Sequence, residues 1–163
     1  MKEQIARKLV DALRSGKYGQ TSEILRAANV VSAQTNDGAV FTDEPANSFC
    51  CLGVLCDLYA QEHPEATWEP YGDAGSCVFN PADNDDRNEE LLPAAVMKWA
   101  DMYSRSGAIR PENNNDESEA LVELRACVRE SSRPNVAALA DANDKGATFS
   151  QLADFIEQHW EAL

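Results

Sequence analysis

The chain has 163 residues, enough for one globular domain with its own core, and we expect a single domain over residues 1–163. Its net charge is −14, from 28 acidic and 14 basic residues, which argues against direct binding to nucleic acid because phosphate contacts need Lys and Arg. No apolar run is long enough to span a membrane, and the odd number of five cysteines fits a reduced cytoplasmic protein better than a secreted disulfide scaffold.

The first quarter of the chain predicts two helices and a β-hairpin. Apolar residues recur on one face of residues 2–15, and Gly16 follows as a stop signal, so this stretch is predicted to be a helix. Thr21 or Ser22 could cap a short second helix that continues to about residue 28. The turn signal Asn-Asp-Gly then lies between two β-prone segments, which predicts a hairpin over residues 30–41.

Residues 48–60 form the longest apolar run and contain three of the five cysteines. This length is too great for an average strand, so we expect a central buried helix, capped by Ser48 or Asn47. Gly53 lowers the helix propensity of the run, which indicates that another backbone approaches the helix closely at this position.

The remaining chain predicts short strands near residues 67–69 and 77–79, followed by three helices. The helices are expected at residues 89–103, at residues 117–131, and from Phe149 onward, where Thr148 and Gln151 form a capping box. Together the elements predict an α+β fold, a mainly helical single domain of about five helices, with a small antiparallel sheet from residues 30–41 and 67–79.

The cysteines allow several interpretations: core packing, a metal site, a catalytic thiol or disulfide partners. No C-x-x-C motif occurs and His63 lies far from His159, so we expect neither a metal site nor a cofactor. Cys50 and Cys51 would lie in the first turn of the central helix, where the helix dipole stabilises a thiolate. The acidic chain opposes thiolate formation and no base accompanies these residues, so we favour packing and lean away from an enzyme.

Four motifs together carry a family resemblance. They are Ala-Leu-Arg-Ser-Gly-Lys-Tyr-x-Gln at residues 12–20, Phe-Cys-Cys-Leu-Gly-Val-Leu-Cys-Asp at 49–57, Leu-Pro-x-x-Val-x-x-Trp-Ala at 92–100, and Asn-Asp-x-Gly-Ala-Thr-Phe-x-x-Leu-Ala-Asp-x-Ile-Glu at 143–157. The chain resembles small uncharacterised accessory proteins of tailed bacteriophages and prophages. The resemblance implies an accessory protein that works in the cytoplasm of the host bacterium during infection, and it carries no established activity.

The polar residues of these motifs are the candidate site. They are predicted either to tie loops to helix ends by hydrogen bonds or, if the loops converge on the first turn of the central helix, to form a small polar site. Backbone N–H groups there would bind a small anionic ligand, helped by the charges of Arg14, Lys17 and Arg26. The candidate ligand-binding residues are Tyr18, Gln20, Cys50, Cys51, Asn143 and Asp144.

Three functions follow as hypotheses. The favoured one is a phage accessory protein that binds a small ligand and sequesters a nucleotide-type immune signal, which is a counter-defence role. The second is an acidic interaction protein or nucleic-acid mimic that inhibits a host enzyme, with its acidic residues gathered on one face. The third is an enzyme that depends on Cys50 or Cys51, or on a carboxylate pair such as Glu89 and Glu90. The partner is thus a small anionic ligand or a host defence protein, and a homo-oligomer is also allowed.

Overall fold

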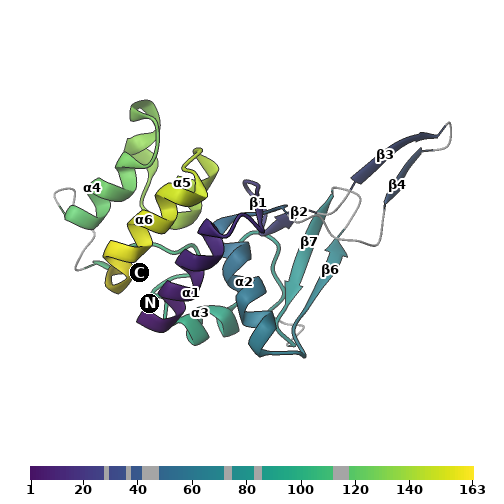
Figure 1. The fold of residues 1–163 in the computed structure, drawn as a ribbon, viewed down its shortest axis with the longest axis horizontal. Coiled ribbons are helices and arrows are strands. Elements are labelled where there is room, and N and C mark those ends of the chain that lie inside the picture. Colours follow the sequence, from purple (N-terminus) through teal and green to yellow (C-terminus); the bar gives the residue numbers. More distant parts are fainter. Residues whose placement is uncertain (28–29, 36–37, 42–47, 72–74, 83–85, 112–117) are drawn as a thin grey trace.

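The structure is a computed structural model that describes the chain except for residues 28–29, 36–37, 42–47, 72–74, 83–85 and 112–117. Within residues 30–35 and 38–41 only the backbone is described. Figure 1 shows a group of helices packed beside a sheet, with α2 between the sheet and the other helices. The two ends of the chain lie close together, and the Met1 amino group donates a hydrogen bond of 2.7 Å to the carbonyl oxygen of Leu163.

Helices form most of the described structure. The α-helices are α1 (Glu3–Arg14), α2 (Cys51–Glu62), α3 (Ala94–Ala100), α4 (Glu119–Ala126), α5 (Leu139–Asp144) and α6 (Phe149–His159), and the 3₁₀-helices η3 (Glu130–Asn135) and η4 (Trp160–Ala162) follow α4 and α6. α1 packs against α6 on one side and against α2 on the other. The apolar stripe of α1 and the capping box of α6 are both confirmed. None of the described helices is both long and apolar enough to cross a bilayer.

The sheet confirms the α+β class but is larger than predicted. Its strands are β1 (Gly19–Gln20), β5 (Ser48–Phe49), β2 (Arg26–Ala27), β7 (Ser76–Asn80) and β6 (Thr67–Tyr71), in this order across the sheet. β1 runs parallel to β5 and the other neighbours are antiparallel, so the sheet is mixed. The predicted hairpin forms as β3 (Val30–Thr35) and β4 (Gly38–Phe41), but it makes a separate two-stranded sheet.

The short helix predicted from residue 21 to about residue 28 is wrong. The chain bends over residues 22–25 and then enters β2, where Arg26 pairs with Cys77 of β7 and with Phe49 of β5. Before it, the N–H of Leu25 donates to the Glu89 carbonyl oxygen at 2.6 Å. Hydrogen bonds to segments that are distant in the sequence satisfy the backbone groups here. These bonds outweigh the local preference for a helix.

The central helix is buried as predicted, although it begins later. Residues 48–49 belong to β5, and Cys50, rather than Ser48 or Asn47, is the N-cap. The predicted close approach at Gly53 is confirmed, because a Cβ atom there would lie 1.7 Å from the Leu25 carbonyl oxygen. That carbonyl also accepts a bond of 3.1 Å from the Cys50 N–H, which fixes the start of α2 against the segment that leads into β2.

The helix predicted at residues 89–103 is shorter than expected. α3 begins only after Pro93, which is its N-cap, and ends at Asp101 in the left-handed conformation. Residues 89–92 are not part of the helix. The Leu92 N–H donates instead to the Arg105 carbonyl oxygen, at 3.0 Å. The helix predicted at residues 117–131 is likewise shortened to α4.

Gly53→Ala should lower the free energy of unfolding by about 3 kcal/mol or more, because the new methyl group cannot fit against the Leu25 carbonyl. Urea unfolding measures this loss. Gly16→Ala is the control: Gly16 has φ +70°, and a methyl group added there would meet no atom within 4 Å, so its cost should be only about 1 kcal/mol of left-handed strain. Equal losses in the two variants would contradict the close approach at Gly53.

Candidate functional site

Five of the six predicted site residues converge at the start of α2. Gln20 comes from β1, Cys50 and Cys51 from the first turn of α2, and Asn143 and Asp144 from the end of α5. The loops therefore converge on the first turn of the central helix, which the sequence had left open. What the residues do there depends on where their hydrogen bonds go.

The Asn143 side chain is buried, with 3% of its surface exposed, and its amide is fully engaged. Its Oδ1 accepts hydrogen bonds from the Cys51 N–H at 3.3 Å and from Gln20 Nε2 at 3.1 Å. Its Nδ2 donates to the Thr21 carbonyl oxygen at 2.9 Å and to Asp144 Oδ1 at 3.3 Å. Asn143 thus joins α5, β1 and the N-terminus of α2.

Gln20 and Asp144 complete the same network. Gln20 Nε2 also donates to the Ala147 carbonyl oxygen at 2.7 Å, and its Oε1 accepts from the Phe149 N–H at 3.0 Å. Asp144 Oδ1 accepts from the Glu23 N–H at 2.8 Å. These contacts match the interpretation in which the polar residues tie loops to helix ends, so we do not place a ligand at this network.

The donors at the N-terminus of α2 are used in the same way. The Cys51 N–H bonds to Asn143, and the Gly53 N–H donates to the Cys50 sulfur at 3.4 Å. Backbone N–H groups that already have internal partners are not available to an anion. The predicted anion site at this helix end is therefore filled by the protein itself.

The cysteine thiols on α2 do not have the lowered pKa of a reactive thiol. Burial raises the pKa of Cys50 to about 11, and burial raises the pKa values of Cys51 and Cys56 still more clearly. A catalytic thiol needs a lowered pKa, so this environment does not favour Cys50 or Cys51 as a nucleophile. Among the residues that the structure describes, no group of three or more His, Cys, Asp and Glu side chains could hold a metal ion.

Tyr18, the sixth predicted residue, lies apart from this network. Its hydroxyl donates to Asp57 Oδ2 on α2 at 2.8 Å, and its ring meets Phe49 edge to face with centroids 5.2 Å apart. Gln61, one turn further along α2, donates from Nε2 to the Tyr18 oxygen at 3.4 Å and to Asp57 Oδ2 at 3.3 Å. Burial, and then the bond to Asp57, raise the pKa of Tyr18 to about 12.

Tyr18 lines an open groove between α1 and α2, which we call the Tyr18 groove. Its volume is about 450 Å³, a size suited to a small molecule. Ala12 and Leu58 give it apolar surface, while Lys8 is ion-paired with Glu62, which also accepts a 3.2 Å bond from Trp99 Nε1. The lining residues are Lys8, Asp11, Ala12, Ser15, Lys17, Tyr18, Leu58, Gln61 and Glu62.

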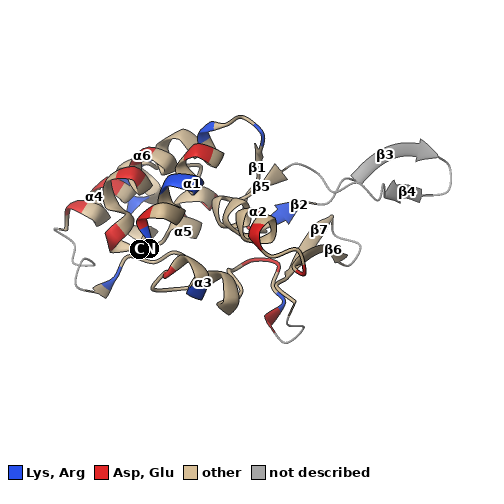
Figure 2. Ribbon diagram, turned by 60° about the horizontal axis from the view of Figure 1, so that its bottom comes forward, with Lys and Arg blue, Asp and Glu red and all other residues tan. Residues whose placement is uncertain are grey.

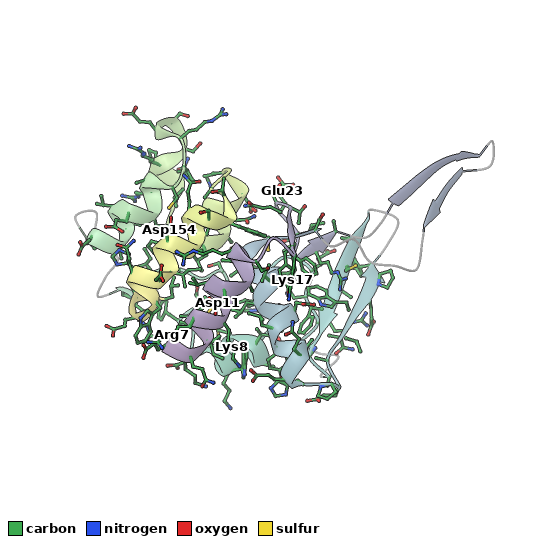
Figure 3. The ribbon with its side chains drawn as sticks, in the orientation of Figure 1. Arg7, Lys8, Asp11, Lys17, Glu23 and Asp154 are labelled. Carbon is green, nitrogen blue, oxygen red and sulfur yellow. The ribbon has the colours of Figure 1, made fainter. Side chains whose placement is uncertain are left out.

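The groove borders the most basic part of an acidic chain. Residues 2–17 hold five of the 14 basic residues but only two of the 28 acidic ones. Figure 2 shows this concentration of basic residues on α1, and Figure 3 shows Lys8, Asp11 and Lys17 following one another along α1 and the turn after it. A count of charges by segment could have found this feature, whereas the roles of Asp57 and Gln61 depend on how the two helices pack.

Only one of the three cations expected to assist binding lines this groove, namely Lys17. Arg14 bonds instead to Asp154 and Glu157 of α6, at 2.6 and 2.7 Å. Arg26 is 9% exposed, and its guanidinium carbon lies 4.6 Å from the ring centroid of Phe49. Both arginines therefore contribute to packing between elements.

One protein-family model matches nearly the full length of the chain. The family model of a domain of unknown function, DUF8296, matches residues 1–160. The chain belongs to this family. No curated protein sequence and no solved structure matches the chain. The description of this family names no activity.

Asn143→Leu should lower the free energy of unfolding by about 3 kcal/mol, because it leaves the Cys51 N–H and the Thr21 carbonyl buried without their partner. Chemical denaturation measures the change. Asn135→Ala, at an exposed position in η3, is the control and should stay within about 0.5 kcal/mol of wild type. A loss at Asn143 no larger than that of the control would contradict the network.

Tyr18 should make stability fall at high pH. Its pKa is higher in the folded protein, about 12, than the ordinary value of 10.0, so the folded state holds the proton more tightly. The resulting stabilisation is complete below pH 10 and is lost as the pH rises from about 10 to about 12. Urea midpoints measured across this range should fall less steeply in Tyr18→Phe than in wild type. Tyr103→Phe, at a tyrosine that is 50% exposed, should keep the wild-type slope.

Proposed function

We propose that this protein binds a small anionic ligand in the Tyr18 groove and does so without catalysis. The observation that carries the proposal is the composition of the groove. Apolar surface from Ala12 and Leu58 lies beside polar side chains, at the most basic segment of a chain with net charge −14. Small-molecule sites combine these same elements, a concave apolar surface with a few polar groups that fix orientation.

The resemblance of the four motifs to phage and prophage accessory proteins is the ground for a setting. We propose that the protein acts in the cytoplasm of an infected bacterium and sequesters a nucleotide-type immune signal. Sequestration needs affinity and no catalytic group, which agrees with buried thiols whose pKa values are raised. It also needs a small site, because such signals are the size of one or two nucleotides.

Inhibition of a host enzyme by an acidic surface is the second candidate, and the charge arrangement supports it less. Figure 2 shows acidic residues on several elements, including α2, α4 and α6, with basic residues among them. Some carboxylates already bind cations of the same chain, as Asp154 and Glu157 do with Arg14, and Glu69 does with Arg87. A nucleic-acid mimic needs carboxylates that face its partner in a regular array.

Thermal unfolding with a panel of cyclic dinucleotides and NAD-derived signals tests the proposal. A ligand at 100 times its dissociation constant adds about 2.7 kcal/mol of stability. In a chain of this size that raises Tm by roughly 5–10 °C. Lys17→Glu should abolish the shift, because it places a negative charge on the wall of the groove.

Lys98→Glu makes the same charge change on the exposed side of α3 and is the matched control, which should keep the shift. A ligand shift that survives Lys17→Glu would place the site elsewhere. The absence of any shift across the panel would contradict small-ligand binding and favour a protein partner.

A further inference from the structure

We infer that two copies of this chain associate through the exposed face of α1, with the two α1 helices antiparallel across a two-fold axis. The inference goes beyond the proposed function, because it concerns the side of α1 that faces α6 and assigns a second copy of the chain as the partner. It rests on a groove between α1 and α6 and on the order of the charges along α1.

A groove of about 410 Å³ lies between α1 and the end of α6, and we call it the Trp160 groove. Ala6 and Val10 of α1 line it and are buried, while Trp160 of η4 lines it and is half-buried. Four charged residues complete the lining, namely Glu3, Arg7, Asp11 and Glu157. Trp and Arg are among the residue types that carry most of the binding energy at protein interfaces, so this lining suits a protein partner.

Two polar groups of the Trp160 groove have no partner within the part of the chain that the structure describes. Asp11 makes no hydrogen bond or ion pair there, and Arg7, one turn away, is paired with Glu3 at 2.5 Å. Trp160 Nε1 makes no hydrogen bond in that part of the chain either, and it is open to solvent. The groove therefore keeps an acceptor and a donor for a partner.

The charges on the exposed face of α1 are self-complementary. Arg7 and Asp11 are both exposed and lie four residues apart, so they follow one another on one face of the helix (Figure 3). In an antiparallel pair whose axis passes midway between them, Arg7 of each copy lies level with Asp11 of the other. Because such an interface is isologous, this one relation gives two ion pairs. A parallel pair in register would instead place Arg7 against Arg7.

The same alignment brings no like charges together along α1. The numbers of residues that lie level add up to 18, as 7 and 11 do, so Glu3 lies level with Ser15 and Gln4 with Arg14. Lys8 takes no part, because it lines the Tyr18 groove and is ion-paired with α2. Each charge of α1 on this face thus meets an opposite charge or a neutral residue of the second copy. This charge complementarity selects the occupant.

The apolar part of the face supplies most of the affinity. Exposed ion pairs stabilise an interface only weakly, so the larger contribution comes from the apolar surface that the second copy covers in the Trp160 groove. One helix and one groove give a weak dimer that depends on protein concentration, rather than an obligate one. The two ion pairs then fix how the copies are oriented.

Sedimentation equilibrium of the full chain over a wide range of concentrations tests the inference. Wild type should show a monomer–dimer equilibrium. Arg7→Glu and Asp11→Arg should each weaken the dimer about 10-fold or more, because each change replaces two attractive pairs by two repulsive ones. A mixture of the two variants should form a heterodimer of wild-type strength, since both pairs across the axis are then attractive again.

The indole N–H of Trp160 reports on the groove itself. Its NMR signal in the ¹⁵N-labelled chain should shift as the wild-type protein is concentrated. The indole signal of Trp99, which is bonded to Glu62, should stay in place. If the dimer forms while the Trp160 signal does not move, the interface lies elsewhere and the inference is wrong.

Lys98→Glu is the matched control, because it makes a similar charge change on the exposed side of α3, and it should dimerise like wild type. Circular dichroism should show that every variant folds, since Arg7 and Asp11 are exposed. A chain that stays monomeric at every concentration would overturn the inference and leave this face to a different protein. So would a dimer that both charge changes leave intact, or a loss in the single variants that mixing does not restore.

Discussion

The Asn143 side chain at the N-terminus of α2 is the interaction on which the rest of the structure depends. It satisfies the Cys51 N–H and at the same time holds Gln20 of β1 and the Thr21 carbonyl. Because a buried amide must have its partners, this network fixes α5, β1 and α2 in one arrangement. It also fills the helix end that would otherwise attract an anion, so the open polar surface lies further along α2.

α2 therefore has two different halves. Its first two turns are buried and pack against neighbouring elements so closely that only glycine fits at position 53. Its last turns carry Leu58, Gln61 and Glu62 to the groove beside α1. One helix thus anchors the core and forms a wall of the proposed site, which gives that wall a rigid support.

Helical periodicity was enough to predict α1 and α6, and the length of the apolar run predicted α2. Gly53 alone indicated the close backbone approach. β2 could not be predicted, because a two-residue strand has no periodicity and Arg26 is held there by pairing with Cys77. The sequence left open whether the polar motif residues converge on the first turn of α2, and it could not tell a saturated network from an open site. Gln61 was missed because its role depends on how α1 and α2 pack.

Hydrogen–deuterium exchange of the Cys51 amide, with and without inorganic phosphate, tests this account most directly. An N–H that is buried and bonded to Asn143 should exchange only when the whole protein unfolds, and phosphate should leave its rate unchanged. Rapid exchange at Cys51, or protection that increases with phosphate, would show that the helix end is open to solvent and anions. That result would move the binding site from the Tyr18 groove back to the N-terminus of α2.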